Sequence, residues 1–139
     1  MCSELEITKY RRRLSGPLAD RIDMHVTMSP VPLEAMGELK HGDASRQIRG
    51  RVERARNIQR DRYGASSRVG VNATATRRAL WREVDHGAKA MLSSAAEALG
   101  LSARGFDRVL RVARTIADLE ESERITDAHT AEAIRYRPG

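Results

Sequence analysis

Residues 100–119 read Gly100-Leu-Ser-Ala-Arg-Gly-Phe-Asp-Arg-Val-Leu-Arg-Val-Ala-Arg-Thr-Ile-Ala-Asp-Leu119, and their spacing predicts a long amphipathic helix. Gly100 is typical of the residue that ends a preceding helix, and Ser102 is expected to cap a new one that runs to about Glu120. The apolar residues of this helix recur with the helical period on one face: Phe106, Val109, Leu110, Ala113, Ile116 and Ala117. The helix should therefore pack on a core through one side only.

The opposite face of this helix is basic. Arg104, Arg108 and Arg111 lie about 180° around the helical wheel from the apolar row, with Arg114 at the edge. Arg104 is the second residue after the cap, among backbone N–H groups without helical partners at the positive end of the helix dipole. An arginine suits that place when an anion compensates its charge, and a phosphate or a nearby carboxylate would serve. An ordinary solvated basic face is the other interpretation of the same spacing.

The sequence before this helix also has a helical pattern, beginning near residue 43. Asp43 is expected to cap a helix that runs to about Tyr63, with Gly64 as its stop. Two apolar rows at helical spacing are predicted to face the core: Ile48, Val52, Ala55 and Ile58 in this helix, and Val84, Ala88, Met91, Leu92, Ala95 and Leu99 in a later one.

Two short helices complete the pattern. One holds Leu80 and Trp81, after a loop of small residues at 65–74, and the last runs from its cap at Thr126 to about Tyr136. The predicted fold class is therefore mainly α, with a bundle of four to five helices over residues 43–139.

The first 42 residues follow another pattern. A short basic helix beginning near Tyr10 leads to Asp20-Arg21, and strict alternation of apolar and polar residues then predicts a strand over Ile22–Met28. Residues 29–42 hold two prolines and two glycines, which is typical of a connector. We therefore divide the chain into 1–28, a helix–strand appendage, 29–42, a connector, and 43–139, the bundle.

Composition limits the class of protein. The 139 residues suffice for one compact domain or a small domain with an appendage, and 22 arginines against 3 lysines give most of a net charge of +6. Such a charge fits an anionic partner, and equally a solvated basic surface. A single cysteine excludes an internal disulfide and indicates a reducing compartment, while no apolar run approaches the roughly 20 residues that span a bilayer. We expect a soluble, cytoplasmic protein without membrane contact.

Other candidate chemistry is weak. The four histidines show no ligand-like spacing, so no metal site is predicted. Trp81 stands beside Arg77, Arg78 and Arg82 and could stack on a nucleic-acid base, although a core anchor is the favoured interpretation. The arginine-rich helix after Asp43 could follow a DNA backbone, but a solvated face is favoured there too.

Three blocks of the sequence resemble one family. The segments Arg13-Leu-Ser-Gly-Pro-Leu-Ala-Asp-Arg-Ile-Asp-Met-His-Val26, Gly100–Leu119 with Ser122-Glu-Arg-Ile125, and the helix after Asp43 are similar, in order and spacing, to bacterial magnesium-chelatase-like AAA+ proteins of the ComM/YifB competence helicase family. The resemblance implies an AAA+ lid, preceded by a helix–strand remnant of the αβα ATPase core. Residues 65–84 match this family least.

The resemblance also implies roles for individual residues. Arg104 matches the sensor 2 arginine, which reaches the γ-phosphate in its own subunit, and Arg21 matches the arginine finger, which reaches ATP in the adjacent subunit. Asp20 would orient the finger or pair across the subunit boundary, and Ser102 and Arg108 would support the nucleotide site or interface. A guanidinium suits both tasks because it can share its charge with two phosphate oxygens at once.

The same resemblance implies the cofactors and partners. The complete protein would use ATP and Mg²⁺, through an ATPase core upstream of this chain, in a ring of like subunits, expected to be a hexamer, that remodels DNA in transformation and recombination. The chain holds neither a G-x-x-x-x-G-K-[ST] loop nor a strand ending in Asp-Glu, so alone it should bind no cofactor and hydrolyse no ATP. By resemblance Cys2 is the last member of a cysteine cluster, so no metal site would be complete here. The alternative function is a free-standing basic helical module that binds DNA or a protein.

Overall fold

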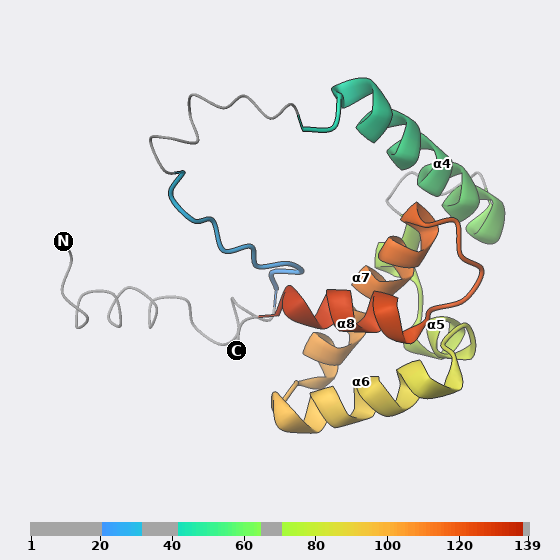
Figure 1. Cartoon of the computed structure of the whole chain (residues 1–139). Coiled ribbons are helices and arrows are strands. Elements are labelled where there is room, and N and C mark those ends of the chain that lie inside the picture. The colour runs from blue at the N-terminus through green and yellow to red at the C-terminus, as the bar shows by residue number, and fades with distance from the viewer. Residues whose placement is uncertain (1–20, 32–41, 65–70, 138–139) are drawn as a thin grey trace.

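A computed structural model of the chain describes residues 21–31, 42–64 and 71–137, and these residues are mainly helical (Figure 1). The described part holds five α-helices, as the sequence predicts for the bundle, together with one 3₁₀ turn. In chain order the elements are α4 (Ser45–Tyr63), the 3₁₀ turn η1 (Val71–Thr74), α5 (Arg77–Arg82), α6 (His86–Ala98), α7 (Ala103–Leu119) and α8 (Asp127–Arg135).

Helix α7 is the centre of the bundle. It packs against α4, α5 and α8, and α6 packs against α8 (Figure 1). Its predicted apolar face supplies the middle of the core, because Val109, Leu110 and Ala113 are almost fully buried. The rest of the core comes from the neighbouring elements: Ala75, Leu80, Val84, Ala88, Leu92, Ile125 and Ala133. The prediction that this long helix packs on the core through its apolar face is thus confirmed.

Local signals set most of the helix ends. The Ser102 hydroxyl accepts a hydrogen bond from the Gly105 N–H at 3.0 Å, which confirms the predicted cap. Thr126 begins α8, where the Nδ1 atom of His129 accepts the Thr126 N–H at 3.0 Å. Gly64 and Gly100 end their helices with φ of 88° and 56°, a region that favours glycine.

The beginning of α4 differs from the prediction. Asp43 does not cap it; Ala44 occupies the cap position, and the Gln47 side chain accepts the Ala44 N–H at 3.2 Å. The Asp43 carboxylate instead lies 3.9 Å from the Arg51 guanidinium. The side chain of the third helical residue thus replaces the expected cap.

The predicted apolar row of α4 is only partly buried. Ala55 is 3% exposed, whereas Ile48 and Val52 are 48% and 44% exposed. The polar Gln59 is buried instead, at the end of α4 that packs against α7. Figure 1 shows the first turns of α4 extending away from the other helices, so this helix is attached mainly through its second half.

The predicted strand over Ile22–Met28 does not form. Residues 24–31 have no regular secondary structure, and Met24, Val26 and Met28 are exposed. A strand requires a neighbour for its backbone groups, and in the described residues the one β pairing is an isolated parallel bridge, Val84–Ile125. The predicted helix near Tyr10 lies outside the described residues.

No described helix combines the length and the apolar character needed to cross a membrane.

Candidate functional site

The first turn of α7 carries the arginine that the sequence singles out. Arg104 is exposed, one residue beyond the start of the helix, and no described residue forms an ion pair or hydrogen bond with its side chain. Ser102 occupies the cap, so its hydroxyl is already engaged by the Gly105 N–H. Gly105 leaves room beside this turn for another cation, because the position of a Cβ on Gly105 would lie 3.5 Å from Nη2 of Arg137. The turn is therefore cationic and open to solvent at Arg104.

The other arginines of this helix do not form a solvated face. The Arg108 guanidinium pairs with the Asp23 carboxylate, and its side chain is only 22% exposed. Arg111 is half-buried and donates to the Ala75 carbonyl at 3.4 Å. The alternative interpretation of an ordinary solvated basic face therefore does not hold for Arg108 and Arg111, because segment 21–31 and the turn around Ala75 contact them.

Segment 21–31 lies against α7 and the end of α8. Besides the Asp23–Arg108 pair, Nη1 of Arg137 donates to the Ile22 carbonyl at 3.1 Å, and the His25 N–H donates to the Tyr136 carbonyl at 2.8 Å. Met24 lines a groove of about 500 Å³ between α7, α8 and η1. These contacts hold the segment that begins at Arg21 beside the helix that carries Arg104.

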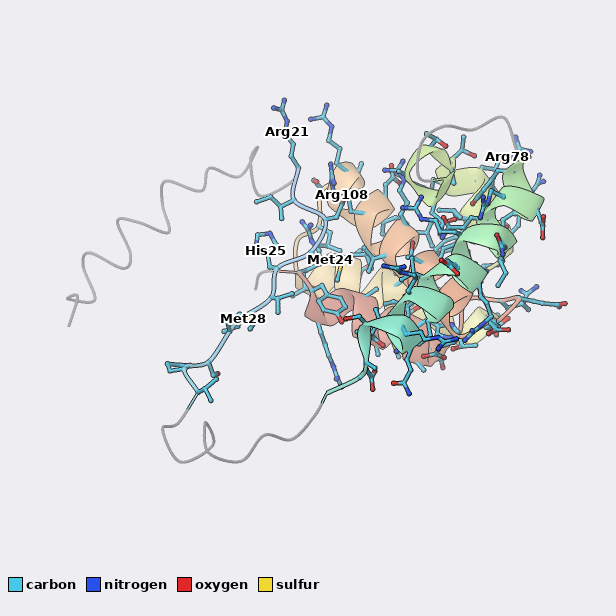
Figure 2. All side chains as sticks on the ribbon, turned by 90° about the horizontal axis from the view of Figure 1, so that it is seen from above. Arg21, Met24, His25, Met28, Arg78 and Arg108 are labelled. Atoms are coloured by element: carbon cyan, nitrogen blue, oxygen red, sulfur yellow. The ribbon has the colours of Figure 1, made fainter. Side chains whose placement is uncertain are left out.

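Arg21 itself makes no such contact. Its side chain is exposed and points away from the bundle, on the side where Arg108 lies (Figure 2). Within the described residues it has no ion-pair or hydrogen-bond partner. Asp20, its predicted companion, lies outside the described residues. The structure thus brings Ser102, Arg104 and Arg108 together on α7 and leaves Arg21 projecting from the adjoining segment.

The most extensive polar cluster was missed by sequence reasoning. Asp118, buried on α7, accepts two hydrogen bonds from Arg62, at 2.7 and 3.1 Å, and one each from Gln59 and Asn72, at 3.1 and 2.8 Å. Nε of Arg114 lies 3.1 Å from the same carboxylate. One carboxylate therefore joins α4, η1 and α7.

Arg114 is the second member of this cluster. The helical wheel places it at the edge of the apolar face, yet its side chain is fully buried. Its guanidinium pairs with Glu83 at 3.0 Å and donates to the carbonyls of Ser122 and Glu123. The i, i+4 spacing of Arg114 and Asp118 was the one available sequence signal for the pair.

The charges of this cluster balance, although Nε of Arg114 is buried without a hydrogen bond in the described residues. Two guanidinium groups, of Arg62 and Arg114, face two carboxylates, of Glu83 and Asp118. Burial alone would lower the pKa of Arg62, but its hydrogen bonds to Asp118 and the nearby negative charges raise that pKa above its ordinary value. Burial also raises the pKa of the adjacent Tyr63 phenol, against the charge of Arg62. The cluster therefore serves the packing of α4 and is no candidate for catalysis.

Comparison with known proteins places this helical bundle in a class. The chain belongs to the family of the magnesium chelatase subunit ChlI C-terminal domain, whose family model matches residues 42–137. A second family model, that of magnesium chelatase subunit ChlI, matches residues 1–36.

Individual relatives agree with this assignment. The chain is 38% identical over 97% of its length to the competence protein ComM of Haemophilus influenzae, and 32% identical over 98% to the uncharacterised protein YifB of Escherichia coli. An uncharacterised protein of Mycobacterium tuberculosis is 35% identical over 86% of the chain. The chain spans about a quarter of the length of these relatives, 26%, 26% and 24% respectively. The resemblance to ComM and YifB inferred from the sequence is thus confirmed.

Proposed function

We propose that this chain is the lid and arginine-finger portion of an AAA+ ATPase, and that Arg104 binds the γ-phosphate of ATP in its own subunit. The observation that carries the proposal is the state of Arg104, which is exposed at the first turn of α7 without a partner in the described residues. The helix dipole and the guanidinium both favour an anion there. Family membership supports the proposal, because the sensor 2 arginine of these proteins matches this position.

The surroundings of Arg104 fit a phosphate group. The nearby arginines add positive charge, although Arg108 is itself paired with Asp23. Arg104 could share its charge with two phosphate oxygens, which strengthens binding as charge develops during phosphoryl transfer. We propose that the ATP-bound Mg²⁺ is held by the ATPase core of the complete protein.

The remaining parts of the proposal concern the complete protein. Arg21, oriented by Asp20, would reach ATP bound in the adjacent subunit of a ring, for which we propose six members. DNA is the proposed substrate of the ring, and the relative ComM is named a competence protein. We propose a cytoplasmic location for this activity.

The test of the proposal is the ATPase turnover of the full-length protein with Arg104→Ala. Loss of a charge-assisted contact to the transferred phosphoryl group should reduce turnover by about 100-fold or more. Arg104→Lys should restore only part of it, because an ammonium lacks the planar fork. Arg49→Ala is the matched control, since Arg49 is also exposed and has no partner in the described residues.

Thermal melting of each variant separates function from folding. Arg104→Ala should melt at nearly the same temperature as the wild type, because substitutions of exposed side chains usually change the free energy of unfolding by about 0.5 kcal/mol or less. Unchanged turnover in Arg104→Ala, or a loss that follows its unfolding, would show that Arg104 binds no phosphate.

A further inference from the structure

An aromatic pair lies where α5 packs against α7. Trp81 of α5 and Phe106 of α7 have ring centroids 5.8 Å apart, with their planes inclined at 45°. Both rings are half-buried against the core, so packing fixes their positions while part of each ring stays accessible. They line an open hollow of about 580 Å³ together with Arg77, Arg78 and Asp107.

Cations surround this hollow. The Arg77 guanidinium lies 5.5 Å from the Phe106 centroid and pairs with Asp107, and the Lys89 ammonium lies 5.6 Å from the Trp81 centroid. Two more arginines of α5, Arg78 and Arg82, are exposed and have no ion pair or hydrogen bond within the described residues. Figure 2 shows Arg78 on the opposite side of the bundle from Arg21. The hollow thus combines accessible rings with uncompensated positive charge.

We propose that this hollow binds single-stranded nucleic acid, with a base stacked on Trp81 and phosphates contacted by Arg78 and Arg82. A base offers a flat face that can stack on the ring. The phosphates of the adjoining nucleic-acid backbone offer negative charge to Arg78 and Arg82, which have no carboxylate partner in the described residues. A duplex fits less well because its bases are already stacked on one another. A protein partner would need a larger apolar surface than two half-buried rings provide.

The hollow adjoins the first turn of α7, since Phe106 belongs to that turn and Arg77 donates to the Ala103 carbonyl at 3.0 Å. Arg104 itself does not line the hollow, and the proposed binding requires no ATP. Trp81 therefore has two roles, because one part of the ring packs on the core while the accessible part offers a stacking platform. The proposal goes beyond the ATP contact at Arg104, and its test is independent of it.

The chain contains one tryptophan, so its fluorescence reports on this surface directly. We would titrate the chain with a twelve-residue oligodeoxythymidylate and with the matching oligouridylate, which distinguishes DNA from RNA. Stacking should quench the Trp81 emission, and the affinity should fall as salt rises. A duplex of the same length should quench the emission less at equal occupancy.

Three variants separate stacking from general attraction, with binding followed by the anisotropy of a labelled strand. Trp81→Leu should weaken binding at least about fivefold, because base stacking on an aromatic ring has that magnitude or more. Trp81→Phe, which keeps a ring, should retain most of the affinity. Arg78→Ala should make the slope of log affinity against log salt shallower by about 0.7, as expected for one lost phosphate contact on a single strand.

Arg49→Ala on α4 is the matched control, since it removes the same charge from an exposed arginine on another helix. Equal effects of Arg49→Ala and Arg78→Ala would show that net charge alone attracts the strand, and this would overturn the proposal. Absence of quenching, or quenching by duplex as strong as by single strand, would overturn it too. None of these results would affect the assignment of Arg104, because the titration contains no nucleotide triphosphate.

Discussion

Asp118 shows how much of this bundle depends on a single buried carboxylate. It accepts hydrogen bonds from Gln59, Arg62 and Asn72 and pairs with Arg114, so three segments of the chain meet at one group. Such a cluster contributes little net stability compared with apolar packing, but removing one member leaves the opposite charge buried without compensation. The consequence is a large penalty for truncation at this residue.

We therefore expect Asp118→Ala to lower the free energy of unfolding by about 3 kcal/mol or more. Both Arg62 and Arg114 would keep only Glu83 as a carboxylate partner. Asp107→Ala is the matched control on the same helix, and it should cost less than about 1 kcal/mol because its partner Arg77 is largely exposed. Urea unfolding followed by circular dichroism measures both. Equal losses in the two variants would contradict the assigned role of Asp118.

Two glycines at helix starts should respond differently to alanine. At Gly105 in α7 an added Cβ would meet its nearest neighbours at 3.5 Å or more, which is ordinary contact. Gly105→Ala should thus raise the free energy of unfolding by about 0.5–1 kcal/mol through reduced entropy of the unfolded chain. At Gly87 in α6 the Cβ would lie 2.7 Å from the Asp127 carboxylate. Gly87→Ala should therefore raise the free energy of unfolding less than Gly105→Ala does, or lower it. The same urea measurement checks both, and a larger gain at Gly87 would refute the comparison.

At the scale of elements, sequence reasoning succeeded where the signal is local. Ser102, Thr126 and Gly64 end or begin helices through bonds and backbone angles within a few residues, so their roles could be predicted from neighbouring positions. Burial of Arg114 could not, because its partners Glu83 and the Ser122–Glu123 carbonyls come from other parts of the chain. The exposed half of α4 was missed for the same reason, since an apolar row does not reveal whether an element exists to cover it.

In the candidate site too, local features could be predicted from the sequence and long-range contacts could not. The position of Arg104 behind its cap follows from spacing along one helix, and the structure places it there. The pairing of Arg108 with Asp23 joins residues 85 positions apart, so no periodicity could indicate it. Segment 21–31 likewise failed to form a strand because alternation specifies a face but supplies no neighbouring strand.

The backbone hydrogen bonding of segment 21–31 can be tested in solution. Of the amides between residues 22 and 28, only that of His25 donates to a backbone carbonyl within the described residues, at Tyr136. Hydrogen exchange should therefore show protection at His25 and fast exchange at its neighbours, while the amides of Val109–Ala113 exchange slowest. Slow exchange across 22–28 in this chain alone would contradict the described structure.

At the scale of the whole molecule, the ion pair between Asp23 and Arg108 connects the two segments that carry the proposed ATP contacts. It ties the segment that begins at Arg21 to the helix that carries Arg104, and Arg137 adds a second tie through the Ile22 carbonyl. If both arginines contact ATP as proposed, they contact different molecules of it, one in the same subunit and one in the adjacent subunit. Their substitutions must then differ in a ring of mixed subunits.

The last prediction uses that difference. Subunits with Arg21→Ala should hydrolyse their own ATP when a wild-type neighbour supplies the finger, whereas subunits with Arg104→Ala should be inactive at their own site whatever the neighbour. Each homogeneous mutant ring should lose about 100-fold or more in turnover, because each guanidinium acts on charge that develops in the transition state. The measurement is ATPase rate against mutant fraction in rings reassembled from mixtures, with thermal melting as the folding control. Adding Arg21→Ala subunits to Arg104→Ala rings should restore activity, since Arg104→Ala subunits supply fingers to neighbours whose own Arg104 is intact. Failure of any mixture of the two mutants to exceed the homogeneous rings would show that the two arginines do not serve separate ATP molecules.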